Sequence, residues 1–461
     1  HAPPRAILSE IFLLMTKPLP LLALLCALVL AAFPNRLHAQ SSPYPGADLK
    51  QLYENLLSDI QQIRIFDNHS HPGFADDPDV DAMASPPGSA ALRIRSDNPE
   101  LIAASHALFE YPYTDFSSEH TRWLIDRKAE LKRQQGNQYF THVLDRLGIE
   151  TAIANRVSMP GYLDKKRFLW AFFVDSFLFP FDNTKIKAQN GDQQVYMPLQ
   201  EKLFRRELQQ AGLHALPPSF DDYLHFVTRI LELDRQNGGI AIKFEAAYFR
   251  SLYFADPPQS QAAAVYAQYR AGGSPSAQQY TAFQDFIFRY LVREAGRLHL
   301  AVHFHTSVGI GDFFSLHNGS VLNLENVLRD PRYDSVTFVL LHGGFPYERQ
   351  IIWLAARKNV YVDSSLTDLY LYPSEFKRIL KYWLSIFPEK VVFGSDAFPF
   401  SEGLGAEESY WLSVQSSREA LAAALAELVS ERAFTKAQAM KIARGYLHDN
   451  AAQVYSALHS Q

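Results

Sequence analysis

Residues Ile63–Gly73 read Ile-Arg-Ile-Phe-Asp-Asn-His-Ser-His-Pro-Gly, an apolar, β-rich run that ends in two histidines one residue apart. Successive side chains of a strand point to opposite faces, so His69 and His71 point to the same side. Neutral imidazole is a common ligand of zinc and related metals. The stretch predicts a buried strand ending in a pair of metal ligands, although an isolated His-x-His pair is more often a surface or core feature.

Seven further β-rich runs follow, and helical patterns such as Phe283–Glu294, Glu348–Ala356 and Arg418–Val429 lie between them. Strands that alternate with helices are typical of βαβ units, whose strands are parallel. The chain is therefore predicted to be an α/β protein, a (β/α)8 TIM-type barrel. The eight predicted strands are Ile63–Asn68, Thr151–Arg156, Leu169–Asp175, Gly239–Glu245, Leu298–His305, Val336–His342, Val360–Ser364 and Lys390–Asp396.

Two connections are too long for a plain strand-to-helix turn. They are residues 72–148, with a charged helical stretch at Ser118–Gln135, and residues 176–238. Long loops in a compact domain are commonly functional. Because they follow strands 1 and 3, we expect cap insertions over the barrel mouth, within one domain that spans residues 40–461.

Composition excludes some partners. The chain has 461 residues, 47% of them hydrophobic, with a net charge of −5 and no long Lys/Arg run. Such a chain buries a large core and lacks the basic footprint of a nucleic-acid-binding protein. We expect a small-molecule substrate and no nucleic acid, and the sequence leaves a homo-oligomer open.

Residues 1–39 are predicted to be an N-terminal extension and signal peptide. A basic start at Met15–Lys17 precedes a short apolar run, Leu19–Phe33, and the end Leu37-His38-Ala39, which resembles a small-x-small cleavage site except that position 37 is Leu. The run is shorter than the ~20 residues of a membrane-spanning helix, although a buried helix or a membrane anchor is the alternative. The expected location is periplasmic or secreted, with no stable membrane span after removal.

The only cysteine, Cys26, lies inside that segment. Any metal in the mature protein must then be held by His, Asp, Glu or a modified Lys.

Polar residues stand where further predicted strands end. His303 and His305 end the fifth strand, His342 ends the sixth and Asp396 ends the eighth. In a barrel of this kind, the carboxyl ends of the strands form one ring that carries the active site. The sequence therefore predicts that these side chains meet His69 and His71.

As an ordered set, these motifs resemble those of the amidohydrolase superfamily, and more closely its amidohydrolase-related branch. Lys243–Tyr248, Val339–Tyr347 and Asp449–Tyr455 are similar to the barrel domain found fused to glutamine-synthetase-like modules, and the resemblance runs from Ile63 to Tyr455. It implies a metal-dependent hydrolase that activates a metal-bound water to cleave a C–N (amide-like) or ester bond.

Carried over residue by residue, the resemblance implies that His69, His71, His305 and Asp396 are metal ligands. Asp396 would also be the general base, and His342 would bind a second metal or polarise the substrate's reacting oxygen. The implied cofactor is one or two divalent ions, with zinc as first choice and manganese or iron as alternatives.

The role of Lys243 is open between two readings. It would be a ligand if carboxylated, and otherwise its ammonium would meet a substrate carboxylate or Glu245, because a buried charge needs a partner. Residues suggested to bind substrate are His303, Glu245, Arg250, Arg156 and Tyr347. For each arginine, a structural salt bridge is the alternative.

Two other functions remain open from sequence. Related branches decarboxylate aromatic acids or isomerise uronates on the same scaffold, and a catalytically degenerate barrel could act as a binding module.

Overall fold

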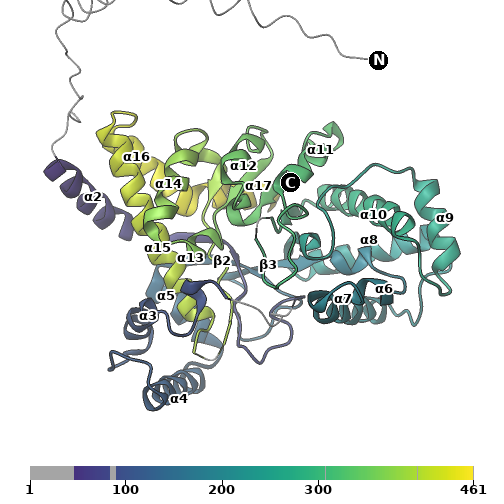
Figure 1. The fold of residues 1–461 in the computed structure, drawn as a ribbon, viewed down its shortest axis with the longest axis horizontal. Coiled ribbons are helices and arrows are strands. Elements are labelled where there is room, and N and C mark those ends of the chain that lie inside the picture. The colour runs from purple at the N-terminus through teal and green to yellow at the C-terminus, as the bar shows by residue number, and fades with distance from the viewer. Residues whose placement is uncertain (1–45, 84–89, 307, 402, 460–461) are drawn as a thin grey trace, which may run out of the picture. The chain divides into compact units, whose positions relative to one another are not determined.

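The computed structural model describes residues 46–83, 90–306, 308–401 and 403–459 (Figure 1). The eight strands of this part form one parallel sheet in chain order, β1 to β8. Each strand falls within or overlaps one of the eight predicted runs. The strands are β1 Ile65–Ser70, β2 Ile149–Asn155, β3 Phe168–Phe173, β4 Gly239–Phe244, β5 Ala301–Phe304, β6 Phe338–Leu340, β7 Val360–Asp363 and β8 Val391–Val392.

Backbone hydrogen bonds bring the last strand back to the first. The N–H of Asn68 donates to the carbonyl of Phe393 at 2.9 Å, and the N–H of Ser395 donates to the carbonyl of His69 at 3.0 Å. The sheet therefore closes into a ring, and the predicted (β/α)8 barrel is confirmed.

Helices lie between the strands, and the charged stretch predicted at Ser118–Gln135 is helix α4 with those bounds. The first long insertion holds α3, α4 and α5, and the second holds α6, α7 and α8. The other helices are α2 Gly46–Gln61, α3 Glu100–Phe109, α5 Tyr139–Leu147, α6 Thr184–Lys187, α7 Gly191–Gln210, α8 Phe220–Gln236, α9 Gln259–Tyr269, α10 Ala277–Arg297, α11 Glu325–Leu328, α12 Glu348–Leu354, α13 Thr367–Tyr370, α14 Pro373–Leu384, α15 Ala406–Ser430, α16 Lys436–Arg444 and α17 Asn450–His459.

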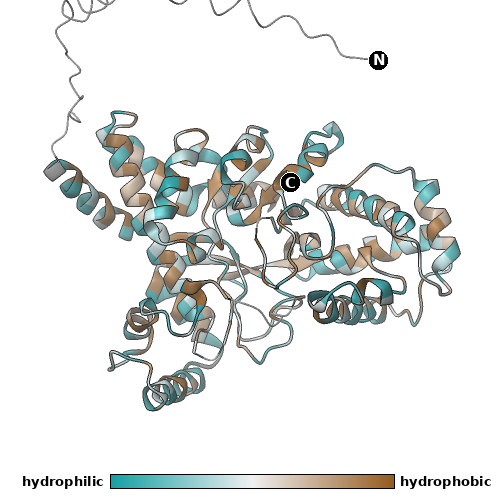
Figure 2. Cartoon of the chain, in the orientation of Figure 1, coloured by the Kyte–Doolittle hydropathy of each residue, from teal (hydrophilic) through white to brown (hydrophobic). Residues whose placement is uncertain are grey.

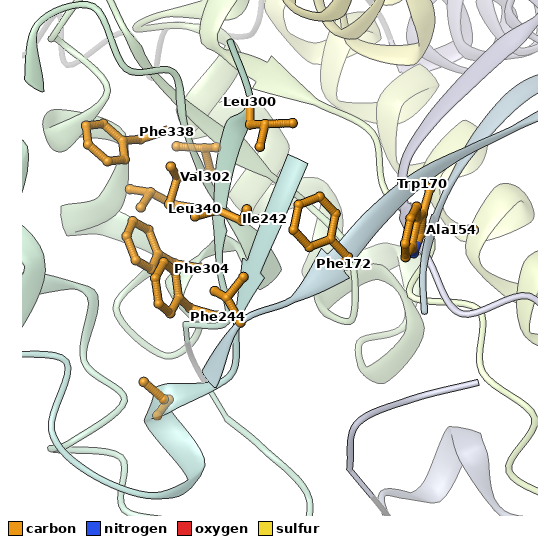
Figure 3. Close-up of a cluster of buried hydrophobic side chains, with 14 of the residues drawn as sticks. Ala154, Trp170, Phe172, Ile242, Phe244, Leu300, Val302, Phe304, Phe338 and Leu340 are labelled. Carbon is orange, nitrogen blue, oxygen red and sulfur yellow. The ribbon is translucent and has the colours of Figure 1, made fainter. Parts of the chain in front are cut away.

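The outer face of the sheet packs against the helices. Figure 3 shows apolar side chains of β4, β5 and β6 lying together, among them Phe244 and Phe304. The ring of Phe288 on α10 lies 4.9 Å from that of Phe244 and 5.7 Å from that of Phe304. Helices such as α8 and α10 present apolar and polar sides, as Figure 2 shows by colour. Because side chains alternate along a strand, the residues between these, Lys243 and His303, turn into the barrel.

The amino-terminal end of the barrel interior is filled by a second apolar cluster. Phe66 and Val392 pack there with residues of the last helix, α17. The ring of Phe66 stacks on that of Tyr455 at 5.7 Å. This end is closed, so the barrel interior is accessible from the carboxyl ends of the strands.

The two insertions meet at those carboxyl ends. The Gln200 amide of α7 donates to the carbonyl of Ala82 in the loop after β1, at 3.1 Å. The Tyr196 hydroxyl of the same helix donates to the carbonyl of Ile310 in the loop after β5, at 2.8 Å. Helix α7 therefore fixes two of the loops that surround the barrel mouth.

The predicted signal peptide, residues 1–39, lies outside the described residues. Within the described part of the chain, no helix combines the length and the apolar character needed to cross a membrane.

Candidate functional site

Three of the predicted metal ligands come together at the mouth of the barrel. The Oδ1 atom of Asp396 lies 3.0 Å from Nε2 of His69 and 3.5 Å from Nε2 of His71. One ligand atom from each of the three residues lies within 4.8 Å of the others. Two imidazoles and a carboxylate form a donor set that suits zinc and related ions.

A bulge in β1 aims the two histidines. Asp67 pairs with Ala152 and Ser70 pairs with Ala154, so β1 contains one residue more than β2 between these two pairs. An extra residue reverses the alternation of side chains along the strand. Phe66 can therefore lie in the lower core while His69 and His71 face the site.

Asp67 holds together the two segments that carry the ligands, the end of β1 and the loop after β8. Its Oδ1 accepts hydrogen bonds from the backbone N–H groups of His69, at 3.1 Å, and Ser395, at 2.9 Å. Its Oδ2 accepts from the Ser395 hydroxyl at 2.6 Å. One buried carboxylate thus connects the end of β1 to the loop that carries Asp396.

The ligands open onto a cavity of about 540 Å³, a volume that includes its opening to solvent. The cavity combines an aromatic wall with titratable groups from β4 and from the segments that follow β1, β4, β5, β6 and β8. Its lining residues are His71, Asp81, Met83, Lys243, Glu245, Tyr248, His305, Ile310, His342, Leu366, Tyr370, Asp396, Phe398 and Phe400.

The other two predicted histidines lie in the same cavity. The ring of His342 lies 4.4 Å from that of His305 and 5.1 Å from that of His69, between ring centres. His305, however, is outside the group of three, and its Nε2 lies 3.2 Å from the carbonyl of Val308. The structure places His305 beside the ligands, and its predicted role as a ligand stays a prediction.

Burial keeps the histidines of the site neutral. It lowers the pKa of His303 and that of His305 to about 3, with the nearby Lys243 ammonium as the second cause. Burial likewise lowers the pKa values of His69 and His342 well below the usual value. Neutral imidazole is the form that binds a metal, so these residues need no deprotonation at neutral pH.

Asp396 is held in its ionised form. Burial acts to raise its pKa, but the hydrogen bond from His71 and the nearby Lys243 ammonium keep that pKa below the usual value. The Asp396 carboxylate and the imidazole nitrogens of His69 and His71 all offer lone pairs to the same point. Few hydrogen-bond donors surround them, and Nδ1 of His69 has no hydrogen-bond partner among the described residues. A divalent cation fits this arrangement.

Lys243 lies beside the ligand group, near the nitrogen of a ligand histidine. The residue is 1% exposed, and its Nζ is 3.5 Å from Nε2 of His69. Among the ion pairs of the described residues, none within 4.0 Å involves Lys243, so the expected contact with Glu245 is not formed. The structure does not test carboxylation of this residue.

Glu245 lines the cavity, but four residues suggested to bind substrate are not among the described residues that do so. The guanidinium of Arg250 pairs with Asp285 at 2.6 Å. Tyr347 donates to the carbonyl of Leu316 at 3.4 Å. Both side chains have nearer partners than the described cavity residues, and their binding of substrate stays a prediction.

Arg156 and His303 are also directed elsewhere. Arg156 is fully buried and bonds to Asp77 at 2.6 Å and to the carbonyls of Pro72 and Ser158. This is the structural salt bridge left open as the alternative. His303 lies within hydrogen-bond distance of the Tyr455 hydroxyl, whose oxygen is 2.8 Å from its Nε2.

Sequence reasoning missed Asp81. Its Oδ2 lies 3.2 Å from Nδ1 of His71, and its side chain lines the cavity beside Glu245. It belongs to an acid-rich loop that also contains Asp76, Asp77 and Asp79. The position of that loop directly after β1 was the available signal, but no spacing distinguishes the aspartate that turns inward.

Part of the backbone strain in the described chain lies at the site. Three non-glycine residues of the cavity have left-handed conformations, with φ of 66° at His342, 60° at Leu366 and 51° at Asp396. Such conformations are costly and cluster at functional sites.

Comparison with known proteins agrees with this geometry. A family model described as amidohydrolase matches residues 253–457. Protein fluG of Emericella nidulans is 29% identical over 153 residues, which are 33% of this chain and 17% of fluG. The similarity therefore spans a minor part of that relative.

Solved structures with the same fold cover nearly the whole barrel. Glucuronate isomerase from Caulobacter crescentus has a TM-score of 0.64 at 14% identity, over 91% of this chain and 97% of the other. Uronate isomerase from Thermotoga maritima has a TM-score of 0.57 at 12% identity, over 88% of this chain and 97% of the other. These comparisons agree with the resemblance found in the motifs: the chain has the (β/α)8 barrel fold of these solved structures, and its residues 253–457 match the amidohydrolase family model.

Proposed function

We propose that this protein is a metal-dependent hydrolase that cleaves a C–N (amide-like) or ester bond of a small molecule, with zinc as its metal. The observation that carries the proposal is the convergence of His69, His71 and Asp396 within 4.8 Å at the mouth of an amidohydrolase-fold barrel. The family match and the enclosed cavity with its two further neutral histidines support it.

His69, His71 and Asp396 would hold the metal. When bound, a divalent ion supplies Lewis acidity and lowers the pKa of a water molecule from 15.7 to about 7. Asp396 is ionised beside His342 and His71, so a carboxylate oxygen can accept a proton and later return it to the leaving group. The aromatic wall, which includes Tyr248, Phe398 and Phe400, encloses the substrate and limits the access of bulk water.

Metal removal tests the proposal directly. We expect the purified protein to contain near-stoichiometric metal, to lose turnover of small amides or esters after chelation and to regain it when zinc is returned. A metal-free preparation that still hydrolyses its substrate would overturn the proposal.

The Asp396→Asn variant tests the role of the carboxylate. We expect kcat to fall at least about 100-fold, because the amide cannot accept the proton, while circular dichroism shows an unchanged fold. The Asp97→Asn variant, at an exposed aspartate, is the matched control and should keep full activity. Retained turnover in the Asp396 variant would remove its assignment as general base.

Product analysis in ¹⁸O-labelled water separates hydrolysis from the other reactions left open by the sequence. Hydrolysis places one labelled oxygen in the acid product. Release of CO2, or an isomer of unchanged mass, would replace the hydrolase assignment with a lyase or an isomerase.

We also propose a periplasmic or secreted location, on the sequence pattern of residues 15–39 alone. Expression of the full coding sequence followed by cell fractionation and N-terminal sequencing tests it. A processed N-terminus near residue 40 in the extracytoplasmic fraction is the expected result, and an unprocessed cytoplasmic protein would contradict it.

A further inference from the structure

Two carboxyl groups lie side by side in the cavity wall, outside the group of three metal ligands. Glu245 follows β4, Asp81 belongs to the loop after β1, and their side chains are within hydrogen-bond contact. Glu245 is 3% exposed, and its Oε2 has no hydrogen-bond partner. A buried carboxyl oxygen is thus left in the cavity without a donor, although burying such a group unpaired is costly.

Among the described residues, no lysine or arginine lies within 4.0 Å of this pair. In the described part of the chain, the only basic group within 4.0 Å of either carboxyl is the imidazole of His71, 3.2 Å from Asp81. Lys243 stands two residues before Glu245, but its Nζ contacts Nε2 of His69 instead. Lys243 therefore acts on the two carboxyls only from beyond 4.0 Å, and the Oε2 atom of Glu245 has no hydrogen-bond donor among the described residues.

A second metal ion does not fit the space beside Asp81 and Glu245. Within the described ranges, the only three residues that bring ligand atoms within 4.8 Å of one another are His69, His71 and Asp396. Asp81 and Glu245 lack a third ligand at that distance, whereas a tightly held metal needs at least three protein ligands.

The remaining wall suits an organic cation. Tyr248, Tyr370, Phe398 and Phe400 supply aromatic rings, and Met83, Ile310 and Leu366 supply apolar surface. Aromatic faces attract ammonium groups, and carboxylates accept their hydrogen bonds. The described lining residues include no arginine, and their one lysine, Lys243, lies with its Nζ against Nε2 of His69.

We propose that Asp81 and Glu245 form a subsite for the ammonium group of the substrate. The substrate class is then a small amide or ester that carries a primary amine on an apolar or aromatic body. Asp81 contacts Nδ1 of His71 while Nε2 of the same ring faces Asp396, so the amine would lie one imidazole away from the metal ligands. The identity of the cleaved bond rests on the proposed hydrolase function, but the binding of the amine does not.

Calorimetric titration of the metal-loaded protein with two unreactive probes tests the subsite. Benzylamine is cationic at pH 7.5, and benzyl alcohol has nearly the same shape without the charge. Wild-type protein should bind benzylamine at least about 10-fold more tightly than benzyl alcohol. The Glu245→Gln and Asp81→Asn variants should each lose that preference and keep their affinity for benzyl alcohol within about twofold. Glu389→Gln, at an exposed glutamate, is the matched control and should bind as wild type.

Two results would overturn the subsite. One is equal affinity of wild-type protein for the two probes, and the other is loss of a metal equivalent from Glu245→Gln, measured by elemental analysis, which would make the pair a metal site. Unchanged metal content together with a lost amine preference supports it. If the protein hydrolyses neutral amides but binds the two probes equally, only the amine subsite is refuted. If it prefers benzylamine as expected but shows no metal-dependent hydrolysis, only the hydrolase proposal is refuted.

Discussion

At the scale of single residues, His342 is oriented by a hydrogen-bond chain that leads away from the cavity. Its Nδ1 lies 3.0 Å from the Ser365 hydroxyl oxygen, and that hydroxyl donates to Asp363. Asp363 also accepts from the N–H of Ser365 at 2.9 Å and from the amide of Asn68 at 2.7 Å, so it serves as acceptor in each of these contacts.

The chain determines which nitrogen of His342 carries the proton. A serine hydroxyl has one hydrogen, and Ser365 gives it to Asp363, so Nδ1 of His342 must be the donor in the bond to Ser365. Nε2 is then left with a lone pair. Of the two roles inferred from the family resemblance, this favours a metal ligand over a hydrogen-bond donor to the substrate.

Removing the Ser365 hydroxyl should release His342. We expect Ser365→Ala to lower kcat/KM by about 10–100-fold, as is typical when the group behind a ligand or catalytic histidine is lost. Ser365→Thr keeps a hydroxyl and should recover part of the activity. Ser364→Ala is the matched control, because Ser364 lies within hydrogen-bond distance of Tyr446 instead. Equal activities of the two alanine variants would show that the chain does not position His342.

At the scale of elements, Arg156 joins the end of β2 to the loop after β1. Its fully buried guanidinium bonds to the carbonyl of Pro72 and the carboxylate of Asp77. Gly73 leaves room for it, since a Cβ at that position would lie 2.5 Å from Nη1 of Arg156. The contact fixes the loop that runs from His71 to Asp81.

Truncating Arg156 should therefore affect stability before it affects binding. We expect Arg156→Ala to lower the free energy of unfolding by about 3 kcal/mol, because an acid and a carbonyl lose a buried partner. Arg156→Lys should recover little, since an ammonium cannot make the same set of directed bonds. Urea unfolding measures the first effect and steady-state kinetics the second. An unchanged unfolding free energy with a raised KM would instead support the substrate-binding role suggested by the sequence.

At the scale of the whole molecule, the fold buries acids that take no part in the site. Asp234 on α8 is one, and burial raises its pKa from 3.8 to about 7. The unfolded chain releases this proton at lower pH than the folded protein does. As the pH rises from 3.8 to about 7, ionisation of Asp234 therefore lowers the free energy of unfolding by a growing amount. Above that range this loss of stability is constant.

Replacing Asp234 by asparagine should remove this penalty. We expect Asp234→Asn to raise the free energy of unfolding by about 2 kcal/mol at pH 8 and to have a smaller effect at pH 5. Below pH 3.8 the two proteins should not differ through this group. Urea unfolding at the two higher pH values measures the effect, with Asp97→Asn as control. A stabilisation that does not depend on pH would show that the carboxyl is not the cause.

The elements were predictable where the pattern is local. Helix α4 has the predicted bounds, and all eight strands occur at the predicted runs. The periodicity of helices and strands can be recognised because it depends on residues close together in the sequence. Strand ends were less predictable. The run Lys390–Asp396 contains only the two-residue β8, since the residues after it leave regular geometry to carry Asp396 at positive φ.

The site was predictable only in part. His69, His71 and Asp396 were found because the ends of parallel strands must meet in a closed ring. The ion pair of Arg250 was not predicted because its carboxylate partner, Asp285, is 35 positions away. Asp81 was missed because an irregular loop has no period from which its direction could be read.

By itself, the sequence determined the barrel, the order of its strands and the side chains at their tips, because periodicity and strand closure depend on residues close in the chain or on topology. Only the tertiary structure decided which charges are paired and which face the cavity. Arg156 and Arg250 are neutralised by partners in the fold, whereas Asp81 and Glu245 meet in the cavity wall without a lysine or arginine among the described residues within 4.0 Å. Pairing of charges depends on distances between segments far apart in the chain, and those distances exist only after the core has packed.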